Sequence, residues 1–217
     1  MKKVLFLLPI LVFLFLYGCS SDDDNTKLSL NKSTVTLNYK TTEQLEATGK
    51  VEWTSENDFV ASVNENGVVE GKHVGKTFII ASNGTEEVKC AVEVTPKYNI
   101  YREPILDFGI TKEELKGREN RELLSETSTT IKYRGNSGSA ASEIAYAFKN
   151  GKMNGAGALV KSSYSSIVMD FLIERYQAAF QEDGVFYFID GNTGNYNKFV
   201  SLSISSSGII IMYTPKN

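Results

Sequence analysis

An unbroken apolar run, residues 4–16, follows Lys2 and Lys3 at the start of the chain. Its length lies within the roughly 7 to 15 residues of the apolar region of a secretory signal, and it is shorter than the roughly 18 residues that a spanning helix needs. The run leads through Tyr17 and Gly18 directly to Cys19. Residues 1–18 are therefore predicted to be a signal peptide, so the folded part of the chain must lie beyond Cys19.

The residues around Cys19 resemble a bacterial lipobox, because the small residue Gly18 precedes the thiol at the end of the apolar run. The resemblance implies that the signal is removed, that Cys19 is acylated with chains such as palmitate, and that everything from Ser20 onward is attached to a membrane by lipid. Each buried methylene contributes about 0.8 kcal/mol and a single chain binds reversibly, so several chains should hold firmly. The alternative is an ordinary signal peptide followed by an unmodified cysteine.

Three consecutive carboxylates, Asp22, Asp23 and Asp24, lie close behind Cys19. Because like charges repel one another and stay hydrated, residues 19–26 are predicted to be a flexible acidic tether. The segment also resembles the acidic export signal that sends some Gram-negative lipoproteins to the outer face of the outer membrane. We therefore expect a lipid-anchored protein of the outer membrane that is exposed on the cell surface.

The charge of the chain argues against nucleic acid as a partner. The full sequence has 23 Lys and Arg against 26 Asp and Glu, and removing Lys2 and Lys3 with the signal leaves 21 against 26, a formal net charge of −5. A nucleic-acid binder needs a basic face. With Cys19 committed to lipid, Cys90 has no partner for a disulfide within the chain, so each domain must be stabilised by its own apolar core.

Residues 27–96 show the alternation of short β-strands. Along residues 88–95 this alternation places Cys90 on the apolar face, and Val51 and Trp53 share a face in the same way. Residues that tolerate positive φ in tight turns stand at Asn66-Gly67 and Asn83-Gly84. Short strands that each bury one face require two sheets packed together, so this region is predicted to be a β-sandwich.

Four segments of this region resemble the bacterial Ig-like domain, group 2, in their order and spacing. They are residues 51–57 (VEWTSEN), 60–63 (VASV), 66–71 (NGVVEG) and 75–81 (GKTFIIA). The resemblance implies a module found in cell-surface adhesins and used as a spacer in surface proteins, without catalysis, and the fold alone does not decide between the two roles. Residues 39–41 stand where the family usually has a glycine before its second strand, so this turn departs from the family pattern.

A boundary is predicted at Pro96 and Lys97, because proline cannot continue a central strand and the composition changes there. Residues 98–217 are predicted to be a second domain. A short helix is expected after Thr111, which can cap it while Glu114 closes a capping box. A longer helix is expected over residues 163–181, where apolar side chains recur at three- and four-residue spacing.

Strands with period-two alternation follow each of these helices. They are expected at 131–133, at 144–148 and up to 160 in the first half, and at 185–189, 198–205 and 209–214 in the second. The order is one helix and three strands, occurring twice. It predicts an α+β domain whose antiparallel sheet carries two helices on one face. This layout distantly resembles TATA-binding-protein-like and β-lactamase-inhibitor-like lipoprotein domains.

No catalytic, metal or cofactor site is predicted. His73, the one histidine, lies in a polar turn beside Lys72 and is expected to be a solvated loop residue. Ser137 lacks the second glycine of a nucleophile elbow, so residues 135–142 are expected to form a flexible loop. The segment beginning at Asp190 lacks the glycine and the final carboxylate of a calcium loop and is expected to be a hairpin turn. One histidine and one free thiol cannot supply four zinc ligands.

The sequence therefore predicts a surface lipoprotein that acts by binding. The Ig-like domain would be a spacer or an adhesive unit, and the second domain a candidate module for a glycan or a surface protein. Alternation places Tyr187 opposite Phe186 and Phe188, so one of these two sets must face away from the helices and offer a platform for stacking. These three aromatic residues are the predicted ligand-binding residues.

Two alternatives from other classes remain. One is a hydrolase that uses carboxylates of the second domain, and the other is a purely structural envelope protein. The candidate carboxylates are Glu143, Asp170 and Glu174, which the pattern places on solvated faces of a strand and a helix. A raised carboxylate pKa within a cleft would favour the hydrolase.

Overall fold

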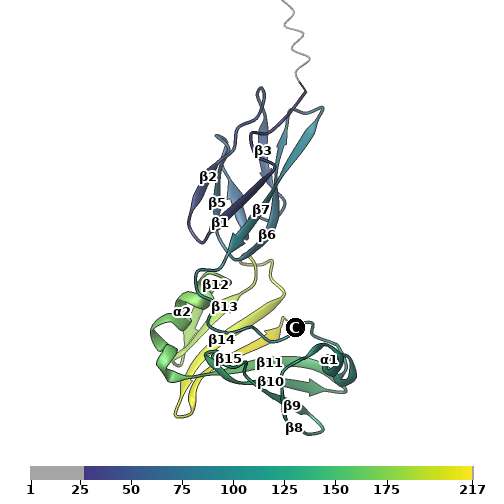
Figure 1. Ribbon diagram of the computed structural model, residues 1–217, viewed down its shortest axis with the longest axis vertical. Coiled ribbons are helices and arrows are strands. Elements are labelled where there is room, and N and C mark those ends of the chain that lie inside the picture. The colour runs from purple at the N-terminus through teal and green to yellow at the C-terminus, as the bar shows by residue number, and fades with distance from the viewer. Residues whose placement is uncertain (1–26, 217) are drawn as a thin grey trace, which may run out of the picture.

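The computed structural model describes residues 27–216. The predicted signal peptide, Cys19 and the three aspartates Asp22, Asp23 and Asp24 lie outside the described residues. Two β-rich units follow one another along the long axis of the molecule (Figure 1). Within the described part, no helix combines the length and the apolarity that crossing a bilayer requires.

The first unit consists of two facing sheets, as the β-sandwich prediction requires. One sheet has the order β1 (Thr34–Asn38), β7 (Glu87–Thr95), β6 (Gly75–Ser82) and β3 (Glu52–Ser55), and the other has β2 (Thr42–Gln44), β5 (Val68–Gly71) and β4 (Ala61–Val63). β1 runs parallel to β7, and the other neighbours are antiparallel. Residues 27–95 therefore form a seven-stranded Ig-like sandwich.

Alternating residues of both sheets form the core of this sandwich. Cys90 is fully buried among Val35, Ile79 and Val92, which confirms the predicted register of β7. Trp53 is half-buried and packs against this core. Gly67, at φ 78°, lies so close to the indole that a Cβ there would come within 3.0 Å of the ring. The turn glycine is therefore needed both for its φ and for its lack of a side chain.

The second unit contains two helices and eight strands. In chain order they are α1 (Lys112–Arg118), β8 (Leu123–Glu126), β9 (Thr130–Arg134), β10 (Ala141–Lys149), β11 (Lys152–Val160), the 3-10 turn η1 (Ser162–Tyr164), α2 (Ser165–Ile173), β12 (Gln177–Glu182), β13 (Val185–Ile189), β14 (Lys198–Ser205) and β15 (Gly208–Pro215). All neighbouring strands are antiparallel, in the order β12-β13-β14-β15-β11-β10-β9-β8.

Each half of this unit has four strands rather than the three predicted. The added strands are β8 and β12, which lie at the two edges of the sheet, and the last strands of the two halves, β11 and β15, meet at its centre. The capping box predicted for α1 is present, because Thr111 and Glu114 bond to each other's main-chain N–H groups. A repeated unit of one helix and four strands therefore builds the sheet.

The prediction of one long helix over residues 163–181 is wrong. α2 ends at Ile173, and residues 177–182 form strand β12. Asp183 and Gly184 have φ angles of 49° and 77°, the conformation of a tight hairpin turn, and they fold β12 back onto β13. Pairing with β13 therefore overrides the helical spacing of Tyr176 and Phe180.

Both helices cover the same face of the sheet. Leu115 of α1 and Phe171 and Leu172 of α2 join one apolar cluster with the inward side chains of the strands. The segment before α1 adds Tyr98, Tyr101 and Ile105 to this cluster. The opposite face of the sheet has no layer over it among the described elements, as expected for an α+β domain with helices on one side.

Candidate functional site

The uncovered face of the eight-stranded sheet, here called the open face, carries side chains that do not belong to the core. One row of paired residues crosses all eight strands on this face. In order from β12 to β8 it consists of Phe180, Tyr187, Ser201, Met212, Gly157, Ala145, Lys132 and Ser125. The row is aromatic at one end, small and apolar in the middle, and polar at the other end.

A groove of about 370 Å³ lies in the middle of the open face, over β10, β11 and β15. Its floor exists because Gly157 and Ala145 have little or no side chain, and Met212 lies across Gly157, where a Cβ would approach the sulfur to 2.9 Å. Glu143 lines one side and is paired with Lys132 over 2.8 Å. This arrangement can bind an apolar group beside a polar rim, and its sulfur side chain is flexible.

The aromatic end of the row is a stacked pair. Phe180 and Tyr187 have ring centroids 4.5 Å apart with planes at 17°, and Phe180 is 51% exposed. Of the three predicted ligand-binding residues, only Tyr187 lies on the open face. Phe188 is 1% exposed and belongs to the core, and half-buried Phe186 packs against that core. Sequence analysis missed Phe180 because it placed residue 180 in a helix.

The Ig-like unit has an apolar groove of its own, of about 450 Å³, lined by residues of β1, β6 and β7. Phe78 contributes an exposed ring to it, and Lys89 lies 5.9 Å from the centroid of that ring. Charged residues of both signs, Glu56, Glu93 and Lys76, line the same groove. It therefore serves as a reference surface of similar size for binding experiments.

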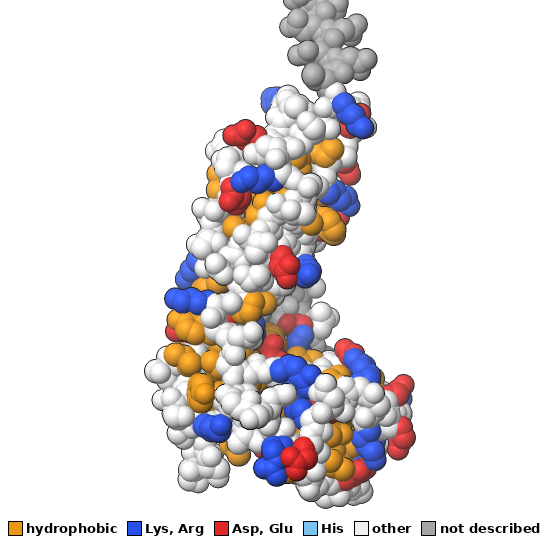
Figure 2. Space-filling view, viewed as in Figure 1, with side chains coloured by type: hydrophobic (Ala, Val, Ile, Leu, Met, Phe, Trp, Pro, Cys, Tyr) orange, Lys and Arg blue, Asp and Glu red, His pale blue; other side chains and the backbone are white. Residues whose placement is uncertain are grey.

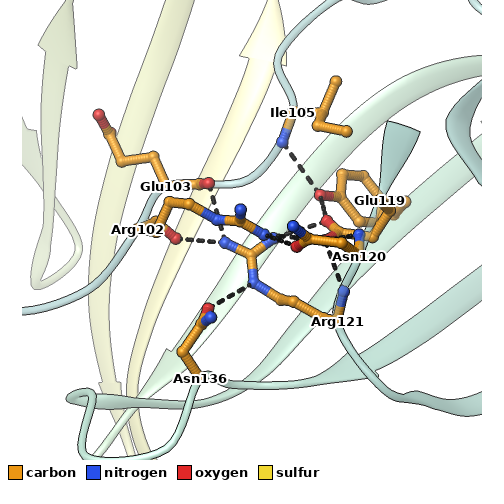
Figure 3. A network of polar contacts seen from close by, with 8 residues as sticks. Arg102, Glu103, Ile105, Glu119, Asn120, Arg121 and Asn136 are labelled. Carbon is orange, nitrogen blue, oxygen red and sulfur yellow. Dashed lines mark hydrogen bonds and ion pairs between the residues drawn. The ribbon is translucent and has the colours of Figure 1, made fainter.

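Glu119 and Arg121 form a buried ion pair on the helix-covered side of the sheet, opposite the open face (Figure 3). Arg121 donates to Oε2 of Glu119 over 2.6 Å, and the Tyr146 hydroxyl donates to the same oxygen, also over 2.6 Å. Burial alone would raise the pKa of Glu119, but these bonds and the N–H of Arg121 outweigh it, so the pKa lies below its ordinary value. A carboxylate that is fully hydrogen-bonded and held ionised is a structural group rather than an acid catalyst.

Arg121 makes further hydrogen bonds, which complete the network in Figure 3. Its guanidinium also donates to Asn136 and to the carbonyl oxygens of Arg102 and Glu103, the latter at 3.1 Å. These bonds hold the segment before α1 against the loop after β9. The network therefore fixes two connections of the domain.

Glu174 differs most from its prediction, because it is 1% exposed rather than solvated. Its carboxylate accepts hydrogen bonds from the main-chain N–H groups of Lys97 and Tyr98, both at 2.9 Å, and from the guanidinium of Arg175 at 2.8 Å. The other two hydrolase candidates lie elsewhere, since Glu143 lines the open-face groove and Asp170 is exposed on α2. The structure does not bring these three carboxylates to one cleft.

His73 is not the solvated loop residue that we predicted. Its ring stacks on Phe59 with centroids 3.9 Å apart and planes at 4°, and its Nδ1 lies 2.7 Å from the carbonyl oxygen of Phe59. Burial, with the nearby charge of Lys72, lowers the pKa of His73. The histidine therefore packs at the end of the Ig-like unit. Within residues 27–216, no group of three His, Cys, Asp or Glu side chains is arranged to hold a metal ion.

The Asp190 segment forms a turn, as predicted. The Asp190 carboxylate accepts bonds from the N–H groups of Asn197 and Lys198, at 2.8 and 2.9 Å, and pairs with the Lys198 ammonium. Because its oxygens are occupied within the turn, the pKa of Asp190 is lowered in spite of burial.

Residues 23–94 match the family of bacterial Ig-like domains (group 2), which agrees with the resemblance of the four segments. No curated protein matches the sequence. Solved structures with similarity include domains 5–6 of the S-layer protein SbsC, at 18% identity, with 88% of this chain and 83% of that chain covered and a TM-score of 0.29.

Two further structures show similarity of the same order. Domains 1–6 of the surface layer protein SbsC have 16% identity and a TM-score of 0.29, with 87% of this chain covered, and this chain spans 21% of that one. Extracellular domains 3–5 of Drosophila OTK have 11% identity and a TM-score of 0.27, with 87% and 60% covered.

Proposed function

We propose that this chain is a lipid-anchored protein of the outer membrane, exposed on the cell surface, that binds a glycan or a protein through the open face of its second unit. The Ig-like unit acts in this proposal as the spacer between the anchor and the binding surface. No chemical step is assigned to the chain.

The arrangement of the two units supports this reading. The described chain begins at the far end of the Ig-like unit, and the second unit lies at the opposite end of the long axis (Figure 1). An anchor at Cys19 would therefore place the Ig-like unit next to the membrane and the second unit away from it. A spacer that is fixed to its neighbour, as the bonds of Glu174 indicate, presents that surface at a defined distance.

The uncovered sheet face is the observation that carries the proposal. A half-uncovered sheet normally shows polar residues to water, whereas this one shows a groove lined by Met212, Gly157 and Ala145 and a stacked pair, Phe180 and Tyr187. Contiguous apolar surface on a soluble domain usually marks an interaction site. Aromatic rings and small apolar floors suit both the faces of sugars and the apolar side chains of a protein.

A binding screen with single-site variants tests this assignment. The mature chain without lipid, residues 20–217, would be screened against glycans and surface proteins, and each ligand found would be measured again with Tyr187→Ala and Met212→Ala. We expect at least one of these variants to weaken binding tenfold or more. Phe78→Ala is the matched control, because it removes an exposed aromatic ring from the other unit. Binding lost only in Phe78→Ala would assign the ligand to the Ig-like unit instead.

The anchor and the export signal are tested separately. Cys19→Ala should release the protein from membranes, and a variant that stays with membranes after a carbonate wash would contradict acylation at Cys19. Replacement of Asp22, Asp23 and Asp24 by Ala should protect the protein from protease added to intact cells. Unchanged digestion would show that these aspartates do not direct surface display.

A further inference from the structure

Strand β12 is an open edge of the sheet that has a β-bulge between Ala178 and Phe180 but none of the basic residues or prolines that protect many edge strands. It lies at one end of the strand order, so only β13 pairs with it, and its six residues, Gln177 to Glu182, include no lysine, arginine or proline. Natural edge strands normally carry such residues, because an unpaired row of N–H and C=O groups is a template for another strand. Residues 178–182 are all exposed.

The opposite edge strand, β8, has charged pairs beside it. Glu122, just before β8, pairs with Arg134, and Glu126, its last residue, pairs with Lys116 over 2.9 Å. Leu123 and Leu124 of β8 are exposed. β12 differs in having no ion pair among the described residues and in having a groove beside it.

This second groove has a volume of about 390 Å³ and is lined by Met169 of α2, residues 178–181 of β12 and the three aromatic residues of β13. It exists because Ala178 and Ala179 stand at a β-bulge, where small side chains leave space next to Met169. Figure 2 shows apolar side chains gathered on the side of the second unit where α2 lies. A single apolar side chain from an adjoining strand would fit this groove.

The surroundings of the groove are acidic. Asp170 follows Met169 on α2, and Glu182 and Asp183 end β12 and form its turn. All three are exposed, and none has an ion-pair partner among residues 27–216. A partner segment that carries Lys or Arg near its apolar side chain would therefore meet unpaired carboxylates.

We propose that the β12 edge binds an extended segment of a partner protein, which adds a strand to the sheet, places an apolar side chain in the Met169 groove and pairs basic residues with Asp170, Glu182 and Asp183. Main-chain bonds to the edge supply affinity in this mode, and the groove and the charges supply specificity. The Met169 groove shares Phe180 and Tyr187 with the aromatic end of the open face, but it has no residue in common with the groove around Met212, so Met212→Ala distinguishes the two proposals.

Other occupants fit less well. The chain's own residues just before position 27 include Asp22, Asp23 and Asp24, whose charge has the same sign as that of the groove's surroundings. A second copy would bring the same acidic surroundings and a mature net charge of −5, from 21 basic against 26 acidic residues. A basic, extended partner has neither problem.

Labelled peptides test the proposal with the mature chain, residues 20–217. The probes are Lys-Val-Thr-Leu-Thr-Val-Lys, a counterpart with Glu in place of both Lys residues, and a counterpart with Pro in place of Leu, measured by fluorescence anisotropy at low and at physiological salt. We expect the basic peptide to bind at least tenfold more tightly than either counterpart. Equal binding of the three peptides, or no binding of the basic peptide at millimolar concentration, would overturn the proposal.

Two variants separate the groove from the charges. Ala178→Trp fills the groove from an exposed position and should weaken the basic peptide at least tenfold, and its matched control is Ser125→Trp on the β8 edge. The combination Asp170→Asn, Glu182→Gln and Asp183→Asn should weaken it about fivefold or more and remove most of its salt dependence. Unchanged peptide affinity in both Ala178→Trp and the triple charge variant would overturn the proposal. A dimer of the natural chain that sedimentation detects and that Ala178→Trp abolishes would also overturn it, because the occupant of the edge would then be a second copy. Met212→Ala should leave peptide binding unchanged even if it abolishes an open-face ligand.

Discussion

Val74 donates its main-chain N–H to the carbonyl oxygen of Glu174 over 2.7 Å, which joins the Ig-like unit to the second unit directly. The Glu174 side chain meanwhile binds the N–H groups of Lys97 and Tyr98 in the connection between the units. Asn192 adds a bond to Asp58 at 3.0 Å. Glu174 thus bonds to both the linker and the Ig-like unit. These bonds, here called the joint, fix the connection between the two units, which is therefore not a flexible tether.

Glu174→Gln should loosen this joint. The amide keeps one acceptor but points N–H groups at donors, so we expect the second unit to lose about 2–4 kcal/mol in its free energy of unfolding. Trypsin should also cleave after the exposed Lys97 more rapidly. Urea unfolding and timed proteolysis measure the two effects. Asp170→Asn is the control, since Asp170 is exposed on α2, the helix that Glu174 caps. Equal rates of proteolysis in the two variants would show that the bonds of Glu174 do not fix the linker.

Tyr146→Phe should destabilise the second unit by about 1.5–3 kcal/mol, because it removes a hydrogen bond to the buried Glu119 carboxylate. The same hydroxyl accepts the N–H of Ile105 at 3.0 Å, which would lose its partner. Tyr133→Phe is a matched control on the neighbouring strand, since its hydroxyl has no hydrogen bond to the described residues. Chemical denaturation measures the free energy of unfolding of both variants. Equal losses of stability in Tyr146→Phe and Tyr133→Phe would show that the Glu119 network is not stabilising.

Lys40→Gly should stabilise the Ig-like unit. Lys40 has a φ of 62°, in the turn where the related family usually has glycine. A left-handed conformation costs a residue with a side chain roughly 1–2 kcal/mol, and glycine's greater freedom in the unfolded chain offsets about half of that, so we expect a gain of about 0.5–1 kcal/mol. Lys50→Gly, at a position without positive φ, should instead reduce stability. A loss of thermal stability in Lys40→Gly would contradict this account of the turn.

The Ig-like unit could be predicted well because its signals are local. Alternation in β7 fixes which residues face inward, and it placed Cys90 in the core correctly. In the second unit the same logic located the strands that alternate, but it missed β8, whose four residues are all exposed and show no alternation. It also missed β12, because Tyr176 and Phe180 fall at helical spacing in a segment whose structure is decided by pairing with β13.

The candidate sites depended on contacts that are distant in sequence. Glu174 lies away from the apolar stripe of α2, so the sequence pattern predicts that it is solvated. It is buried because the linker around Lys97 and Tyr98, more than seventy residues earlier in the chain, packs against it. Phe180 joined Tyr187 only through the hairpin. The sequence pattern therefore predicts which side chains share one face of a helix or strand. A site formed by two segments that are distant in sequence cannot be predicted until the contact between those segments is known.

Stability of the Ig-like unit should fall as the pH falls below about 6.5, because of His73. Burial lowers the pKa of His73 from its ordinary value of 6.5, so the unfolded chain takes up a proton at a pH where the folded chain does not. The group contributes nothing to the pH dependence well above 6.5, where the ring is neutral in both states, and it destabilises the fold progressively from there down to the folded pKa. Protonation would also disturb the His73 ring stacked on Phe59, and His73 immediately precedes Val74, whose N–H bonds to Glu174 between the two units. We therefore expect urea midpoints to drop between pH 7.5 and 5.5 in the natural chain and to drop less in His73→Phe, which keeps the stacking. Parallel curves for the two proteins would show that the carboxylates, not His73, set the pH dependence.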